Sequence, residues 1–174
     1  MERYDFISLD VDALGHDALS AEADVITETF GKEIKKSDGG IDRKKLGSIV
    51  FSDKNKLKQL ENIVHPRMKA MAREFVERNA NNSIAIHAAI LCQMNLEKLC
   101  SAVIWVNAPV ILRIKRAKKR DTLSFMEVIR RIWAQRKITP QKSCQNVDIY
   151  NVENGRSRES LEKQVKALLR DIKA

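Results

Sequence analysis

Long apolar runs are missing from this chain of 174 residues. No stretch approaches the ~18 consecutive apolar residues that are needed to cross a bilayer. Residues 1–5 carry charges with no apolar run behind them, so they do not resemble a secretory signal peptide. The 3 cysteines are odd in number and lie in apolar or helical stretches, so we expect reduced thiols rather than a disulfide framework. Together these features favour a cytoplasmic protein without a membrane partner.

Aromatic residues are also scarce, at 5% of the chain, whereas positive charge is in excess. The 32 Lys and Arg residues outnumber the 23 Asp and Glu residues and give a net charge of +9. This balance suits nucleic acid or a polyphosphate ligand, and it is equally compatible with a solvated basic surface. Few aromatics are available to stack on bases and no nucleic-acid-binding motif is recognisable, so nucleic acid is the less favoured partner.

Segments with strand and helix patterns alternate along the chain. Nearly continuous apolar runs, which are typical of strands buried on both faces of a parallel sheet, occur at residues 83–89 and 102–107. A short apolar run that ends in carboxylates at residues 6–12 and a last short segment at residues 147–152 also have strand patterns. Helical patterns occur at residues 18–30, 42–51, 53–79, 111–120, 123–137 and 161–172. We expect Pro66 to break or kink the helix over residues 53–79. The alternation predicts an α/β fold with a parallel sheet.

Two carboxylates stand at the end of the first predicted strand. Asp10 and Asp12 are two residues apart, so a strand that contains both places them on the same side. Ligands of open α/β sheets bind beyond the carboxyl ends of the strands. A carboxylate there can accept a proton from a hydroxyl or help to position a metal-bound phosphate. The alternative is that Asp12 caps the following helix, and the pattern alone does not decide between the two.

Several short fragments follow one another in a characteristic order. They are the residues at positions 9–16 (LDVDALGH), 30–31 (FG), 41–46 (IDRKKL), 49–51 (IVF) and 60–66 (LENIVHP). In this order and spacing they resemble the dephospho-CoA kinase family, in which an Asp-x-Asp strand end precedes an Asp-Arg-x-x-Leu helix, an Ile-Val-Phe sequence and a Leu-Glu-x-x-x-His-Pro signature. Residues 116–121 (RAKKRD) and 131–135 (RIWAQ) resemble the lid of that family, so the resemblance extends over essentially the whole chain.

The resemblance implies a three-layer, P-loop kinase-like α/β fold with a parallel sheet. It implies one domain over residues 1–174, with a helical acceptor-binding region at about 42–79 and a basic helical lid at about 113–140. Members of the family transfer the γ-phosphate of ATP to the ribose 3′-hydroxyl of dephospho-CoA, the last step of coenzyme A biosynthesis. ATP and dephospho-CoA are therefore the expected small-molecule partners, and Mg²⁺ is the expected cofactor beside ATP.

The resemblance also assigns roles to individual residues. Asp12 aligns with the second aspartate of the strand end and is the expected catalytic base or acceptor-positioning group. The residues expected near the acceptor are Asp10, Arg43, His65 and His87, and those expected on the lid near ATP are Arg116, Arg120, Arg131 and Gln135. Guanidinium groups can neutralise charge on a transferring phosphoryl group, although an exposed basic helix face is the alternative for the arginines. For His65, before Pro66, the alternative is a structural turn. No residue is assigned as a metal ligand.

The sequence departs from the family pattern at the end of the second predicted strand. His87 stands where the family usually carries an acid, Ala88–Leu91 replace a Pro-Leu-Leu pattern, and Gln93 stands where Glu is common. These differences count against an intact acceptor site. The sequence Glu-Asn-Gly at residues 153–155 also differs from the usual Asn-x-Gly, which bears on adenine binding.

The phosphate-binding loop of a P-loop kinase is absent. Such a loop ends in Lys-Ser or Lys-Thr, with backbone amides and a lysine that hold phosphates and a hydroxyl that holds magnesium. The chain has only 6 glycines and no Gly-Lys-Ser or Gly-Lys-Thr sequence, and Gly31-Lys32-Glu33 lacks both the earlier glycine and the hydroxyl. Residues 1–6 look like the end of the helix that follows such a loop. We therefore expect roughly twenty more residues upstream, including the first strand of the sheet.

We accordingly expect an N-terminally shortened dephospho-CoA kinase, explained by a misplaced start site or a truncated gene, that is inactive in this form. One alternative is a non-catalytic remnant that binds anions or nucleotides, and a less favoured one is a basic nucleic-acid-binding protein. An in-frame glycine-rich loop in the coding sequence upstream of Met1 would favour the enzyme, and a stop codon there would favour the remnant.

Overall fold

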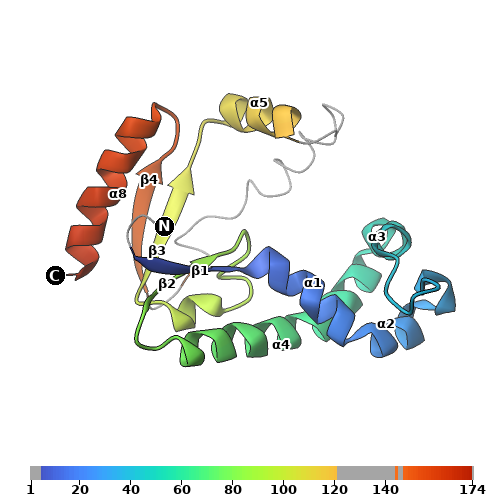
Figure 1. Ribbon diagram of the computed structural model, residues 1–174. Helices are drawn as coiled ribbons and strands as arrows, with labels where there is room; N and C mark the ends of the chain where they lie inside the picture. Colours follow the sequence, from blue (N-terminus) through green and yellow to red (C-terminus); the bar gives the residue numbers. More distant parts are fainter. Residues whose placement is uncertain (1–4, 121–143, 145–146, 174) are drawn as a thin grey trace. The chain divides into compact units, whose positions relative to one another are not determined.

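The computed structural model describes residues 5–120, 144 and 147–173 (Figure 1). The chain divides into two compact units, Met1–Leu99 and Cys100–Ala174, each of which has its own parallel strand pair. The assignment of residues 1–174 to one domain stays a prediction. None of the helices in the described residues combines the length and apolar character that a bilayer span needs.

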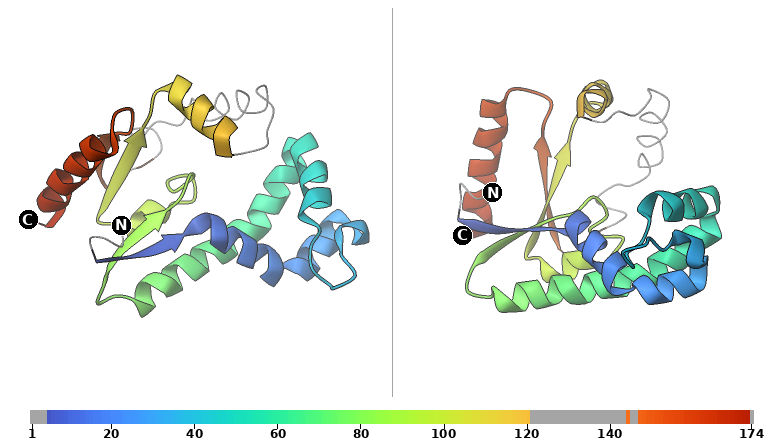
Figure 2. Two further views of the ribbon diagram at one scale, coloured as in Figure 1. Left: turned by 45° about the horizontal axis from the view of Figure 1, so that its top comes forward. Right: turned by 45° about the vertical axis from the view of Figure 1, so that its right-hand side comes forward.

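The first unit contains a two-stranded parallel sheet. Strand β1 (Phe6–Asp10) pairs with β2 (Ser83–His87) in a register that runs from Phe6↔Ser83 to Asp10↔His87. The helical elements of this unit are α1 (Val11–Ala21), α2 (Ala23–Phe30), η2 (Lys32–Ile34), α3 (Arg43–Ser52), α4 (Lys54–Arg78) and η3 (Leu96–Leu99). Helices α1 and α4 pack against each other, and both views of Figure 2 show them side by side.

Aspartates begin three of these helices. The carboxylate of Asp10 caps α1, that of Asp42 caps α3 and that of Asp53 caps α4, and each accepts hydrogen bonds from two backbone amides of the first turn. Such a cap satisfies amides that have no partner inside the helix. The expected helix over residues 18–30 therefore begins earlier, at Val11, and Glu22 divides it into α1 and α2.

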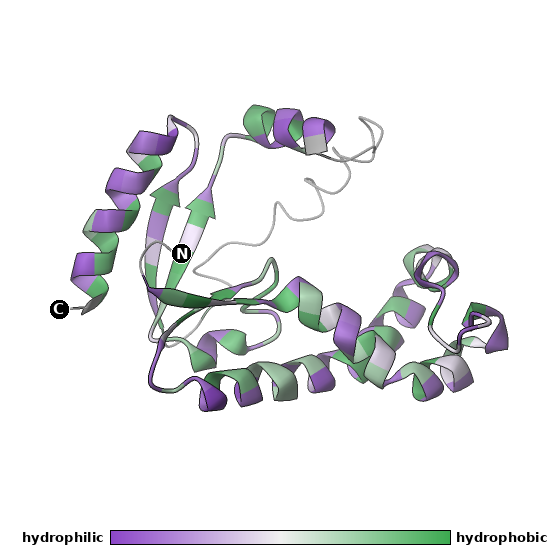
Figure 3. Ribbon diagram, in the orientation of Figure 1, coloured by the Kyte–Doolittle hydropathy of each residue, from purple (hydrophilic) through white to green (hydrophobic). Residues whose placement is uncertain are grey.

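Helix α4 is a single helix of 25 residues with Pro66 inside it, so Pro66 does not break the helix, and the expected kink stays a prediction. Its buried residues, Val64, Met68 and Ala72, are four apart and form one stripe toward the core. The core also includes Leu9 of β1 and Ala18 of α1. Figure 3 shows β1 as mostly hydrophobic and α4 as mixed, in keeping with a helix that buries one side.

The second unit repeats the parallel pairing. Strand β3 (Ala102–Asn107) pairs with β4 (Asp148–Glu153), from Ala102↔Asp148 to Asn107↔Glu153. Helix α5 (Val110–Arg120) follows β3, and α8 (Arg158–Lys173) packs on β4. The buried apolar residues of this unit include Val103, Val152, Leu168 and Leu169. The helix expected over residues 123–137 lies outside the described residues.

The α/β fold with parallel strands is confirmed, and all four expected strands are present. They form two separate two-stranded sheets in the described residues rather than one continuous sheet. The expectation of reduced thiols is wrong for Cys92 and Cys144, which are disulfide-bonded, whereas Cys100 keeps its thiol.

Candidate phosphoryl-transfer site

The carboxyl ends of β1 and β2 bring two of the expected site residues together. Asp10 and His87 are the last residue pair of the parallel ladder, so they lie on neighbouring strands, roughly 5 Å apart at the backbone. Both side chains are exposed. A carboxylate and an imidazole at this edge of a sheet are placed where α/β proteins bind ligands.

The helix cap at this site is Asp10 and not Asp12. Asp10 Oδ1 accepts hydrogen bonds from the backbone amides of Asp12, at 2.9 Å, and Ala13, at 3.4 Å. The expectation that both aspartates share one side of a strand is wrong, because the strand ends at Asp10 and Asp12 lies in the first turn of α1. The alternative role of Asp12 as the cap is wrong for the same reason.

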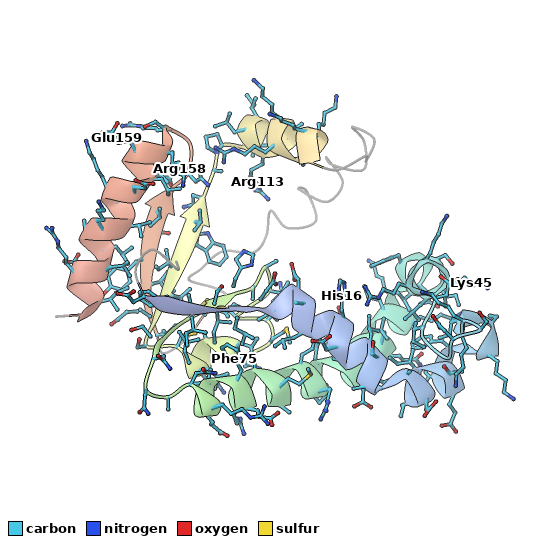
Figure 4. The ribbon with its side chains drawn as sticks, in the orientation of Figure 1. His16, Lys45, Phe75, Arg113, Arg158 and Glu159 are labelled. Carbon is cyan, nitrogen blue, oxygen red and sulfur yellow. The ribbon has the colours of Figure 1, made fainter. Side chains whose placement is uncertain are left out.

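Asp12 is exposed in the first turn of α1, where the helix dipole favours a negative charge. Its carboxylate is thus available to a ligand beyond the strand ends, while the carboxylate of Asp10 is engaged in capping. His16 lies one turn further along α1, is also exposed and is labelled in Figure 4. Residues four apart share a helix face, so His16 adds a second polar group near Asp12. In the sequence, the four-residue spacing between Asp12 and His16 is the feature that points to His16.

The remaining acceptor-side candidates lie on α3 and α4, which pack against each other. Arg43 is exposed in the first turn of α3. The neighbouring cap, Asp42, has its pKa lowered mainly by the hydrogen bond from the backbone amide of Lys45. Helix α3 therefore begins at the ionised carboxylate of Asp42, whose pKa the charges of Lys45 and Lys36 also lower.

His65 lies inside α4, so the alternative of a structural turn at His65 and Pro66 is wrong. The side chain is half-buried, and burial lowers the pKa of His65 below its usual value. The nearby carboxylate of Glu61 opposes this shift and the charge of Lys69 adds to it. The imidazole is consequently favoured in its neutral form, in which one ring nitrogen can accept a proton or a hydrogen bond.

In the second unit, Arg116 is already engaged with the backbone. Its guanidinium Nη1 donates a hydrogen bond of 3.0 Å to the carbonyl oxygen of Asn154. Part of its hydrogen-bonding capacity therefore ties α5 to the segment after β4. Arg120 is the last residue of α5, while Arg131 and Gln135 lie outside the described residues.

The segment after β4 is held by a side chain that the sequence did not single out. Gln164 of α8 brackets Glu153: its Oε1 accepts from the Glu153 amide at 3.0 Å, and its Nε2 donates to the Glu153 carbonyl at 3.1 Å. The Asn154 amide donates to the Asn107 carbonyl at 2.7 Å. At Gly155 an added Cβ would lie 2.9 Å from Pro109 Cδ, so this close approach requires glycine. The carboxyl ends of β3 and β4 are thereby fixed to one another.

The described residues do not by themselves form a magnesium site. No group of three or more His, Cys, Asp and Glu side chains in the described ranges is arranged to hold a metal ion. The sequence also lacks the hydroxyl of a Gly-Lys-Ser or Gly-Lys-Thr loop. Asp12 offers carboxylate oxygens near the strand ends, but the other ligands that Mg²⁺ needs are not supplied here.

Known proteins resemble this chain in structure and in sequence. The crystal structure of TT1252 from Thermus thermophilus superposes with a TM-score of 0.79 and 28% identity over 98% of this chain and 86% of that one. A dephospho-CoA kinase of Borreliella burgdorferi is 30% identical over 98% of this chain and 83% of the relative, and one of Treponema pallidum is 32% identical over 92% and 81%.

The fold is an α/β fold of the P-loop kinase class. The family model of dephospho-CoA kinases matches residues 1–157. This chain belongs to the dephospho-CoA kinase family, whose members are transferases that use ATP.

Proposed function

We propose that this chain functions in the transfer of the γ-phosphate of ATP to the ribose 3′-hydroxyl of dephospho-CoA, which yields coenzyme A. The observation that carries the proposal is the family match over residues 1–157. The exposed carboxylate of Asp12 beyond the carboxyl ends of β1 and β2 supports it, because the acceptor of such a reaction needs a proton-accepting group there. A place in coenzyme A biosynthesis supports a cytoplasmic location.

The residues of the first unit take the acceptor side of the reaction. Asp12 accepts the hydroxyl proton or orients the hydroxyl for attack. Asp10 fixes the start of α1 and thereby the position of Asp12. His87 lies beside Asp10 and takes part in acceptor binding. Arg43 and His65, on α3 and α4, bind more distant parts of the same acceptor.

The residues of the second unit take the ATP side. Arg116, Arg120, Arg131 and Gln135 belong to the basic lid, where charged and amide groups stabilise the phosphates during transfer. The hydrogen bond of Arg116 to Asn154 supports a further role for this residue in holding the segment after β4. Mg²⁺ would accompany ATP and would neutralise charge on its phosphates.

The absence of a Gly-Lys-Ser or Gly-Lys-Thr sequence sets the expected level of activity. The amides, the lysine and the hydroxyl of that loop each stabilise the phosphates, and loss of a single comparable donor costs about a hundredfold in rate or more. We therefore expect the 174-residue chain to bind dephospho-CoA and to form no coenzyme A above background. The second candidate function is anion binding without catalysis. The lack of a Gly-Lys-Ser or Gly-Lys-Thr sequence favours it.

The test uses two preparations. The 174-residue chain is titrated calorimetrically with dephospho-CoA and assayed for coenzyme A with ATP and magnesium. A chimera that carries, ahead of Met1, a strand, a glycine-rich loop ending in Lys-Ser or Lys-Thr and a helix is assayed in parallel. Acceptor binding by the chain and turnover by the chimera are the expected results. Turnover by the chain alone would refute the expected inactivity. If the chain binds no acceptor and the chimera, folded by circular dichroism, has no turnover, the non-catalytic function is favoured.

A further inference from the structure

The excess of positive charge lies in the second unit. Residues 100–174 contain 17 Lys and Arg residues against 7 Asp and Glu residues, whereas residues 1–99 contain 15 against 16. Helix α5 alone has six cations and no acidic residue among its 11 positions. Such a concentration of one sign on a single helix attracts an anionic surface.

The cations of α5 lie on more than one side of the helix. One side, which we call the lysine face, combines residues that are three or four positions apart and an aliphatic residue at its start: Ile111, Lys115, Lys118 and Lys119. Arg116 is about 140° away from Ile111 around the helix axis, and its Nη1 donates a hydrogen bond of 3.0 Å to the Asn154 carbonyl. The arginine side of α5 is thus directed to the segment after β4, whereas the lysine face is exposed.

Exposed aliphatic side chains stand where the lysine face begins. Ile111 is 80% exposed, and its neighbour Val110 is 52% exposed. Together with Val106, near the end of β3, they are three of the five large hydrophobic residues that are exposed in the described ranges. Three such side chains within six residues form an apolar patch beside the lysines, and a patch with a polar rim marks a surface for a partner.

The combination of lysine and aliphatic side chains favours a lipid surface over other partners. Protein interfaces are enriched in aromatic residues and arginine and depleted in lysine. Single-stranded nucleic acid is bound by aromatic side chains that stack on the bases, and α5 contains none. Helices that lie on membranes instead combine lysines, whose flexible stems keep the charge in water, with apolar side chains that enter the lipid interface.

We propose that the lysine face, together with Val110, binds the surface of bilayers that contain anionic lipids. The lysines face the lipid phosphates, and Ile111 and Val110 enter the boundary between head groups and acyl chains. The expectation of no membrane partner rests on the lack of an apolar run that could span a bilayer, and a helix that lies on the surface needs no such run. Arg116 takes no part in this contact, so the proposal is independent of phosphoryl transfer.

Vesicle flotation without ATP or dephospho-CoA measures this binding. The 174-residue chain is mixed with vesicles of phosphatidylcholine alone or with added phosphatidylglycerol, and we expect binding only to the latter. Lys115→Gln with Lys119→Gln should weaken it about thirtyfold, which corresponds to about 2 kcal/mol, since each lysine near an anionic surface contributes. Ile111→Ser should weaken it about tenfold. Lys163→Gln with Lys166→Gln, on α8, removes equal charge from the same unit and should change the affinity little.

Each contrary result overturns a stated part of the proposal. If the unmodified chain does not bind vesicles with phosphatidylglycerol, the proposal is wrong. Equal losses in the two double variants would assign the attraction to the net charge of the unit rather than to the lysine face. Tight binding by Ile111→Ser would show that no aliphatic side chain enters the interface. If a single-stranded oligonucleotide binds in place of vesicles and the loss of Lys115 and Lys119 abolishes this binding, the partner is nucleic acid. The substituted residues are exposed, so circular dichroism should show an unchanged fold in every variant.

Discussion

Replacing Asp10 tests which of the two strand-end aspartates is structural. Its Oδ1 accepts from the amides of Asp12 and Ala13, at 2.9 and 3.4 Å. Asp10→Ala leaves both amides without this acceptor and should cost about 1 kcal/mol in the free energy of unfolding. Asn caps helices as well as Asp does, so Asp10→Asn should cost only a few tenths. Asp12→Asn keeps the cap and loses one charge near the helix N-terminus, roughly 0.3–1 kcal/mol.

Urea unfolding of the four proteins, followed by far-ultraviolet circular dichroism, measures these differences. Hydrogen exchange adds a local readout, because loss of the cap should accelerate exchange at the amides of Asp12 and Ala13 and leave the rest of α1 less affected. A wild-type stability for Asp10→Ala would refute the assignment of the cap. So would an Asp10→Asn variant that is destabilised as much as Asp10→Ala, because asparagine should keep the cap.

Turnover separates the catalytic role of Asp12 from the capping role of Asp10. In the chimera with a phosphate loop, Asp12→Asn should reduce kcat by roughly 10²–10⁴-fold, since an amide does not accept the hydroxyl proton. Asp10→Asn should reduce it much less, because its effect is confined to the position of α1. A fully active Asp12→Asn chimera would remove Asp12 from the mechanism and leave His87 as the next candidate at this edge.

Three further outcomes follow from the structure. Burial lowers the pKa of His65, so the unfolded chain takes up a proton more readily, and stability should fall as the pH drops through about 6.5. His65→Gln should flatten this dependence in urea unfolding across that pH range, and an unchanged slope would contradict the assignment. Glu97 is 4% exposed, and its Oε2 accepts no hydrogen bond within the described ranges. Glu97→Met should therefore raise the free energy of unfolding by about 1–3 kcal/mol, and a clear loss would show that this carboxylate has a partner. Gln164→Ala removes the two hydrogen bonds to Glu153 and should cost about 1–3 kcal/mol. Lys166→Ala, on the exposed side of the same helix, should cost almost nothing. Equal losses in the two variants would show that the hydrogen bonds from Gln164 to Glu153 do not stabilise the fold.

Much of the architecture was predictable because local patterns determine it. Strand β3 has the predicted bounds, since its apolar run ends abruptly on both sides. Helices α3 and α4 begin beside Asp42 and Asp53, whose side chains are strong caps. The start of α1 was missed because no glycine or proline separates it from β1, so Val11 fits a strand and a helix equally well.

The site was less predictable because its contacts join residues that are distant in sequence. The sequence pattern predicts a strand that ends near Asp10 and another that ends near His87. It does not predict that these two strands are neighbours in the sheet. The same holds for Gln164, whose position in α8 indicates only a polar residue on a helix until β4 is seen beside it. Phe51 was quoted as part of a sequence signature, and only its exposure in the structure assigns it to the surface.

The pairing of the strands has a consequence for amide hydrogen exchange. In the described part of the chain, β1 pairs only with β2 and β3 only with β4, so each strand has one hydrogen-bonded side (Figure 1). Amides of successive residues in a strand point to opposite sides, and a single partner protects only every second one. Exchange along β2 should therefore alternate between slow and fast from residue to residue. A further strand that joined either sheet would convert this alternation on the adjoining strand into continuous protection, which gives a direct measure of sheet completion in solution.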